Sequence, residues 1–247
     1  MKPEFISSNP VLSTITVIIP AFNEGRTVAR TVEAVQNAFI HSEFDCKCFV
    51  IVDGPDLDAI QALADVDNIM VVVNSKNEGK GASLRTGIEL SNSEFVAFFD
   101  ADLEIDVADL LKASRLLMSC IESNTAGVYG SKNHPDSTVN YPRIRRVLSK
   151  ISRVLIKRLT SLDVSDSQTG LKVFRGNDIR RAVAYTEQVG YLFDLEIMSI
   201  MAKFGSKFKP CSITLNYSFN SSIGIWQVVT AAMDMLKVVI SVRKVVI

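Results

Sequence analysis

Two carboxylates stand two residues apart directly after an apolar run. Asp100 and Asp102 follow Phe95–Phe99, and Glu104 comes two residues later, where it could supply a third oxygen. Carboxylate oxygens are hard ligands of the kind that Mg²⁺ and Mn²⁺ prefer, and both ions keep positions free for phosphate and water. The spacing predicts a divalent-metal site that holds a diphosphate, and a solvated turn is the alternative.

Two further Asp-x-Asp pairs occur, so the pattern alone is weak. Asp56 and Asp58 are more easily explained as a turn and a helix N-cap. Asp65 and Asp67 stand before an apolar run rather than after one. Of the three pairs, only the one that begins at Asp100 directly follows a run without polar residues, and this context favours it.

Two other polar segments follow apolar runs or open a helix. Asp53 comes directly after Phe49–Val52 and could accept hydrogen bonds from a nucleotide base or ribose, or simply form a turn. Asn77–Gly81 opens a helical segment, so its backbone N–H groups and Lys80 could meet an anion. A plain glycine turn is the alternative for this second segment.

Short apolar runs alternate with segments of helical periodicity along the chain. The expected strands are Ile15–Ile19, Phe49–Val52, Ile69–Val73, Phe95–Phe99 and a fifth that ends with Gly127–Tyr129. The expected helices are Arg26–Phe39, Lys80–Leu90 and Val107–Ile121. We expect the first strand to stop at Pro20. This alternation predicts an α/β fold with a mostly parallel sheet and helices on both faces. Ligands of such sheets bind at the carboxyl ends of the strands, where the polar residues above converge.

Six segments, in this order, resemble the motifs of family 2 glycosyltransferases with the GT-A fold. They are Val17–Glu24, Asn77–Gly81, Phe98–Glu104, Tyr129–Lys132, Asp166–Phe174 and Gly190–Glu196. The last two are similar to the polyprenyl-phosphate branch, the dolichyl-phosphate mannose and glucose synthases. The resemblance covers residues 14–224, so we expect a GT-A domain at 1–222 and an amphipathic helix at 223–247.

The resemblance implies transfer of a hexose, mannose or glucose, from a GDP- or UDP-sugar to a polyprenyl or dolichyl phosphate. The reaction would be a direct displacement with inversion, assisted by Mg²⁺ or Mn²⁺. A phosphate monoester is already an anionic nucleophile, so catalysis would consist of positioning and charge stabilisation. One alternative is a glycosyltransferase that acts on a glycan or sugar acceptor. Another is an inactive membrane-associated protein that binds a sugar nucleotide. A processive synthase is disfavoured because Trp226 lacks the Gln-x-x-Arg that would precede it.

The resemblance also implies roles for individual residues. The donor-binding positions are Pro20, Phe22, Glu24, Asp53, Lys80, Asp100, Ala101, Asp102 and Lys132. The metal ligands are Asp100, Asp102 and Glu104, and the acceptor phosphate would meet Arg145 and Ser149. The catalytic set is Asp100, Asp102, Arg145 and Asp166. Asp166 would orient Arg or Lys groups, unless it only caps a loop.

The chain departs from the family pattern at its phosphate-binding cations. Lys132 stands where the family usually has arginine. Asn216 and Ser221-Ser222 fall near the places of an arginine and a Ser-Lys pair that touch the donor phosphates. The donor diphosphate would therefore rely more on the metal, on Lys132 or on the arginines of the acceptor loop. This departure motivates the inactive alternative.

Two segments suggest contact with a membrane. Arg143–Leu159 combines basic residues with an apolar face at helical spacing, which suits an anionic bilayer, although it could be an ordinary surface helix. Ile223–Ile247 is apolar around most of a helix, with one narrow polar stripe that includes Asp234, Lys237 and Ser241. Its cover could be the domain itself, a second subunit, a membrane partner or lipid.

Composition bears on the possible partners of the protein, on the state of its cysteines and on its location. The chain has 247 residues, with 27 basic residues against 27 acidic ones, so a nucleic-acid partner is not expected. The four cysteines are expected to be reduced thiols. No apolar run is long enough for an ordinary transmembrane helix. We expect a cytoplasmic protein, peripheral on the cytoplasmic face of a membrane.

Overall fold

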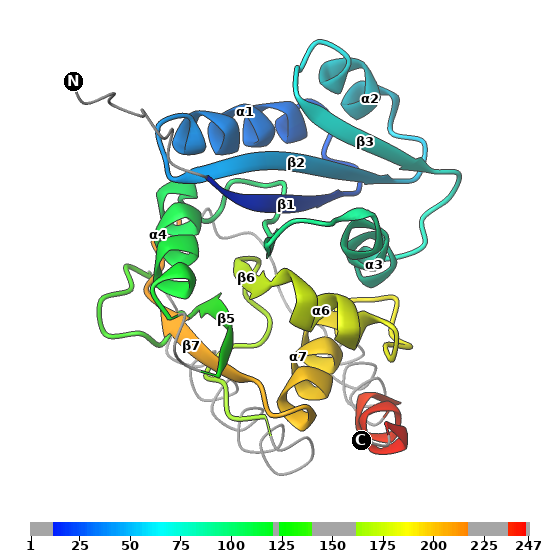
Figure 1. Cartoon of the computed structure of the whole chain (residues 1–247). Coiled ribbons are helices and arrows are strands. Elements are labelled where there is room, and N and C mark those ends of the chain that lie inside the picture. The colour runs from blue at the N-terminus through cyan, green and yellow to red at the C-terminus, as the bar shows by residue number, and fades with distance from the viewer. Residues whose placement is uncertain (1–11, 121–123, 140–161, 217–236, 246–247) are drawn as a thin grey trace, which may run out of the picture.

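One seven-stranded sheet forms the centre of the molecule (Figure 1). The computed structural model describes residues 12–120, 124–139, 162–216 and 237–245. The strands are β1 (Ser13–Ala21), β2 (Phe44–Asp53), β3 (Ile69–Asn74), β4 (Phe95–Phe98), β5 (Thr125–Gly130), β6 (Lys172–Arg175) and β7 (Lys207–Cys211). Their order across the sheet is β3-β2-β1-β4-β6-β5-β7.

The sheet is mostly parallel, as expected for an α/β fold. The strand β1 pairs in parallel with β2 and β4, β2 pairs in parallel with β3, and β5 with β7. Only β6 runs the other way, antiparallel to β4 and to β5. The carboxyl ends of β1, β2 and β4 therefore lie along one edge, where the Asp-bearing turns follow.

Helices cover both faces of this sheet. They are α1 (Thr27–Phe39), α2 (Leu57–Leu63), α3 (Lys80–Leu90), α4 (Val107–Met118), α6 (Gly176–Val183) and α7 (Phe193–Lys203). Alternate residues of β1 enter different cores: Val17 and Ile19 join the cluster with α1, α2 and α4, whereas Ile18 joins the cluster with α3, α6 and α7. This period of two is the expected consequence of a strand buried on both faces.

The prediction that the first strand stops at Pro20 is wrong, because β1 continues to Ala21. The carbonyl of Ile18 accepts from the N–H of Phe99 on the side of β4, and the ladder with β4 ends at that point. Pro20 lies two residues further, so its nitrogen faces the same side, where no ladder bond is needed. A proline fits a strand at such a place because its missing N–H leaves no partner unpaired.

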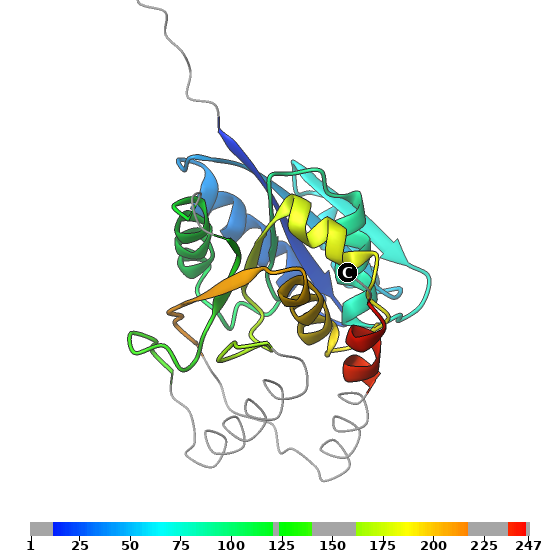
Figure 2. The same cartoon turned by 60° about the horizontal axis from the view of Figure 1, so that its bottom comes forward.

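The C-terminal segment packs onto the domain over its described part. Residues 237–244 are helical and lie beside α7 (Figures 1 and 2). Val238, Val242 and Val245 are buried in the same core as α7. For these residues the cover is the domain itself, one of the candidates named above, whereas residues 223–236 lie outside the described part. In the described part of the chain, no helix is both long and apolar enough to cross a membrane.

Candidate functional site

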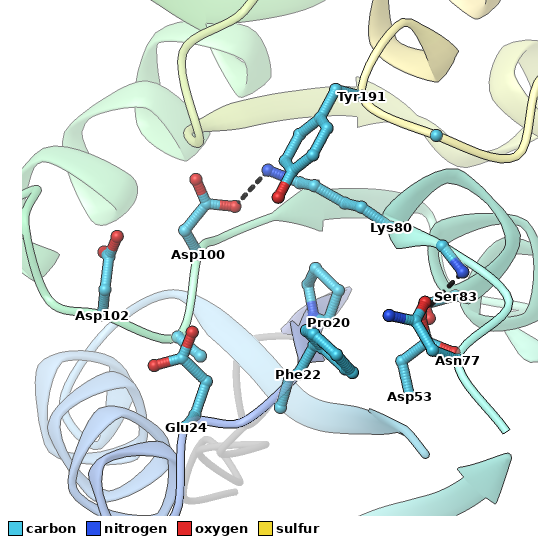
Figure 3. A pocket seen from close by; sticks show the side chains of 14 residues that line it. Pro20, Phe22, Glu24, Asp53, Asn77, Lys80, Ser83, Asp100, Asp102 and Tyr191 are labelled. Atoms are coloured by element: carbon cyan, nitrogen blue, oxygen red, sulfur yellow. Dashed lines mark hydrogen bonds and ion pairs between the residues drawn. The ribbon is translucent and has the colours of Figure 1, made fainter. Parts of the chain in front are cut away.

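A pocket of about 310 Å³ opens at the carboxyl ends of β1, β2 and β4. The strand ends and the start of α3 supply most of its lining (Figure 3). Its lining residues are Pro20, Ala21, Phe22, Glu24, Asp53, Asn77, Gly79, Lys80, Ser83, Asp100, Ala101, Asp102, Gly190 and Tyr191. The structure thus brings together eight of the nine predicted donor-binding residues, all except Lys132.

Lys80 and Asp100 form an ion pair inside the pocket, with Lys80 Nζ 2.5 Å from Asp100 Oδ1. The lysine comes from the first turn of α3 and reaches across to the end of β4 (Figure 3). Burial by itself would lower the pKa of Lys80, but the charges of Asp100 and Asp194 outweigh it and the pKa is raised. Lys80 is therefore a firmly held cation at the first predicted metal ligand.

The backbone at Gly170, in the segment before β6, lies close to Oδ2 of Asp100. A Cβ added at Gly170 would overlap Asp100 Oδ2, so only glycine allows this approach. Behind the site, the fully buried Lys172 places Nζ 3.2 Å from Asp194 Oδ2. Burial lowers the pKa of Lys172, although the charge of Asp194 opposes this shift. The segment before β6 and the start of α7 together support the acidic end of β4.

Burial and neighbouring carboxylates raise the pKa values of three acidic side chains near the pocket. Burial raises the pKa of Asp102, against a hydrogen bond from the N–H of Glu104 and with the help of the charge of Asp100. Burial and then the charge of Asp102 raise the pKa values of both Glu24 and Glu104. The negative charges of Asp100 and Asp102 that contribute to these shifts favour binding of a cation at this place.

The predicted metal ligands are not gathered into a closed cage. Asp100 and Asp102 line the pocket, whereas Glu104 does not. Within the described residues there is no group of three or more His, Cys, Asp or Glu side chains placed to hold a metal ion. Two open carboxylates still suit a metal that takes its remaining ligands from phosphate and water, as Mg²⁺ commonly does.

Asp53 braces the turn that begins α3. Its Oδ1 accepts from Asn74 Nδ2 at 3.0 Å and from the N–H of Glu78 at 2.8 Å, and its Oδ2 accepts from the N–H of Gly79 at 2.8 Å. The sequence predicts for Asp53 either a nucleotide contact or the formation of the following turn. The structure adds a third role, because this carboxylate fixes the backbone that carries Lys80.

Lys132 and Asp166 lie together, outside the pocket lining. The N–H of Lys132 donates to Asp166 Oδ2 at 3.4 Å. Next to them, Ser165 Oγ lies 3.1 Å from the hydroxyl of Tyr129 and 2.7 Å from Ser131 Oγ. The pKa of Glu104 is raised by burial and by Asp102, and the charge of Lys132 opposes this rise, so Lys132 lies close enough to act on the acidic turn.

Four lining residues had no predicted role, namely Ala21, Ser83, Gly190 and Tyr191. Tyr191 is 78% exposed and stands over the pocket beside Lys80 (Figure 3), and Gly190 precedes it. Ser83 is fully buried and its hydroxyl has no hydrogen-bond partner within the described residues. Its position three residues after Lys80 places both on one face of α3, which was a signal available in the sequence.

Some predicted residues lie outside the described part of the chain. Arg145 and Ser149, the predicted acceptor-binding residues, are two of them, and so are Ser221 and Ser222. The second Asp-x-Asp pair, Asp56 and Asp58, lies within the described part, and Asp56 caps α2 by accepting from the N–H of Ala59. That observation confirms the prediction of a helix N-cap there.

Solved structures share this fold. Glucosyl-3-phosphoglycerate synthase from Mycobacterium tuberculosis in complex with uridine diphosphate matches with a TM-score of 0.69 and 15% identity, over 93% of this chain and 80% of that one. The same enzyme with Mn²⁺, uridine diphosphate and phosphoglyceric acid matches with a TM-score of 0.67 and 16% identity, over 95% and 80%. This likeness confirms the GT-A fold.

Curated relatives and a family model agree with the fold. Dolichyl-phosphate beta-glucosyltransferase of Dictyostelium discoideum is 24% identical over 260 residues, which cover 90% of this chain and 79% of that protein. The Saccharomyces cerevisiae protein of the same name is 24% identical over 206 residues, covering 74% and 61%. The family model described as Glycosyl transferase family 2 matches residues 16–181. That match spans more than half of the chain, and the protein therefore belongs to glycosyl transferase family 2.

Proposed function

We propose that this glycosyltransferase moves a hexose, with glucose favoured, from a nucleotide sugar to the phosphate of a dolichol or another polyprenol. The observation that carries the proposal is the pocket, in which Asp100, Asp102 and Lys80 meet at the carboxyl ends of the strands. The names of the relatives, dolichyl-phosphate beta-glucosyltransferases, support both the acceptor and the sugar. Uridine diphosphate in the solved neighbours supports a UDP-sugar over a GDP-sugar.

A divalent cation, Mg²⁺ or Mn²⁺, fits the residues present. The ammonium group of Lys80 already occupies Asp100 as a stand-in cation. Burial, with the help of the charge of Asp100, raises the pKa of Asp102, and a bound metal would stabilise the ionised carboxylate. Asp100 and Asp102 would hold the ion, with Glu104 as the third predicted ligand. When bound, the ion neutralises the departing nucleoside diphosphate.

The chain's own residues would bind and orient the two substrates. Phe22 and Tyr191 offer exposed rings at the mouth of the pocket, which suits stacking against a nucleotide base. Lys80 would face the donor phosphates once Asp100 releases it. Arg145 and Ser149 would hold the acceptor phosphate for in-line attack with inversion, because a guanidinium matches a phosphate with two hydrogen bonds. Asp166 would orient Lys132 toward the donor phosphates. The hydrogen bond from the backbone N–H of Lys132 to Asp166 supports this role.

A polyprenyl phosphate resides in a membrane, so the enzyme must work at its surface. We place it on the cytoplasmic face, held by the basic segment Arg143–Leu159 and by part of the segment 223–247. A membrane subunit or a second copy of the chain could share this attachment. A non-enzymatic sugar-nucleotide-binding protein remains the second candidate, because Asn216 and Ser221-Ser222 replace the expected cations.

One assay separates these candidates. Purified full-length protein is incubated with Mn²⁺ or Mg²⁺, a panel of UDP- and GDP-hexoses, and a polyprenyl phosphate in detergent. We expect a lipid-linked hexose from UDP-glucose, and no product without the metal. UDP binding by calorimetry with no transfer to the lipid would favour the binding protein. Transfer to an added glycan but not to the lipid would identify the other enzyme class.

A further inference from the structure

A fully buried carboxylate on α7 joins the C-terminal helix to the pocket wall. Glu196 is 0% exposed and lies in the first turn of α7. Its Oε2 accepts from the N–H groups of Glu187 and Gln188 at 3.0 and 2.9 Å. Its Oε1 accepts from the hydroxyl of Ser241 at 2.5 Å. One side chain thus connects α7, the loop that precedes it and the C-terminal helix.

The segment held by Glu196 continues directly into the pocket wall. Gly190 and Tyr191 line the pocket, two or three residues after Gln188. The carbonyl of Val189 accepts from the N–H of Ala82 at 3.1 Å, so this segment rests on the first turn of α3. Gly79 has a φ of 101°, and a Cβ there would overlap the carbonyl of Val189. The position of residues 187–191 is therefore linked to that of Lys80.

Two further contacts hold the same segment. Arg85 of α3 donates from Nη2 to the carbonyls of Thr186 and Gln188, both at 3.0 Å. Lys244 of the C-terminal helix donates to Glu187 Oε1 at 3.1 Å, in an exposed ion pair. An exposed ion pair contributes little, so the buried hydrogen bond of Ser241 is the stronger of the two links from the C-terminal helix.

We propose that Glu196 and Ser241 are positioning residues, through which the docked C-terminal helix holds residues 187–191 in place as a wall of the donor pocket. The proposal rests on the proposed function only in taking this pocket as the donor site. A buried carboxylate oxygen must keep its hydrogen-bond donor, and removal of that donor weakens whatever the carboxylate holds. Ser241 belongs to the polar stripe of the C-terminal helix, and its hydrogen bond to Glu196 explains why this buried position carries a hydroxyl group.

The consequence is that donor affinity depends on the docking of residues 237–244. The helix whose earlier part is expected to meet the membrane or a partner also supports, at its end, the wall that carries Tyr191. Glu196 does not line the pocket, so it acts only through residues 187–191.

The test compares Ser241→Ala with Ile240→Ala in the full-length protein. Ile240 is the adjacent residue of the same helix and is 48% exposed, so it matches the helix position without the buried contact. Hydrogen exchange is measured at the amides of Glu187 and Gln188 and at the amides of β1 and β2. UDP affinity is measured by calorimetry in the presence of Mn²⁺.

We expect Ser241→Ala to speed exchange at Glu187 and Gln188 by about tenfold, with β1 and β2 unchanged. We expect it to weaken UDP binding by about threefold to tenfold, whereas Ile240→Ala changes neither. Equal exchange and equal UDP affinity in the two variants would overturn the proposal. A faster exchange in β1 and β2 by the same factor would also overturn it, because it would show general destabilisation. If the unmodified protein binds no UDP, the proposed function fails, and the exchange measurement still decides the link.

Discussion

Asp102 belongs to the acidic turn that the proposed reaction needs most. Its raised pKa reflects burial and the neighbouring Asp100. We expect Asp102→Ala to slow sugar transfer by about a hundredfold or more, because the charge of the diphosphate would be less well compensated. Initial rates with UDP-glucose and a polyprenyl phosphate measure this effect. Asp65→Ala is the control, since Asp65 is exposed and belongs to an Asp-x-Asp pair to which no metal is assigned. Near-normal activity of a folded Asp102→Ala enzyme would contradict the assignment.

Lys80 is paired with Asp100, one of the two carboxylates proposed to hold the metal. Its ammonium group lies 2.5 Å from Asp100 Oδ1. We therefore expect Lys80→Met to raise the affinity for Mn²⁺ in the absence of nucleotide, by about tenfold, since a buried competing charge is removed. The same variant should transfer sugar more slowly, because the lysine no longer faces the donor phosphates. Mn²⁺ titration followed by electron paramagnetic resonance gives the first quantity, and an unchanged or lower affinity would show that Lys80 does not compete.

At the scale of elements, the close approach of the segment before β6 to the end of β4 holds the site together. A Cβ at Gly170 would overlap the carboxylate of Asp100, so Gly170→Ala must displace one of them. We expect this variant to lose most of its Mn²⁺-dependent UDP affinity, while its thermal midpoint falls by only a few degrees. Asp65→Ala is again the control, because Asp65 is exposed and does not line the pocket. Similar UDP affinities of the two variants would argue against this role of the close approach.

At the scale of the whole molecule, membrane attachment would depend on two different surfaces. The basic segment Arg143–Leu159 should add about 1 kcal/mol per Lys or Arg near an anionic bilayer. We expect the protein to float with anionic vesicles at low salt and to be partly released at high salt. Changing Lys150, Arg153 and Lys157 to Gln should weaken this flotation while leaving UDP binding unchanged. Flotation that does not respond to these changes would mean that the attachment lies elsewhere.

Periodicity was sufficient for the first five strands and for α1, α3 and α4, whereas β6, β7, α2, α6 and α7 were not predicted from it. Apolar runs of four or five residues followed by helical spacing recur along the chain, and the helix Lys80–Leu90 was predicted with its observed bounds. The predicted end of the first strand at Pro20 was wrong. A proline is tolerated within a strand where its nitrogen faces a side on which the neighbouring strand has already ended. That information lies in the sheet order and not in the local sequence.

The acidic turn after β4 could be recognised from residue types because it is a local pattern, and its place in the pocket followed from the rule for parallel sheets. Contacts between distant segments were decided only by tertiary structure. Asp53 binds the turn before α3, Lys80 occupies Asp100, and Glu196 meets Ser241 across 45 residues of chain. No spacing predicts such pairs, because hydrogen-bond partners are chosen by the packing of elements and not by separation along the chain. For the same reason, the apolar pattern of the C-terminal helix showed that it needs cover, and only the folded chain showed that its last turns find it on α7.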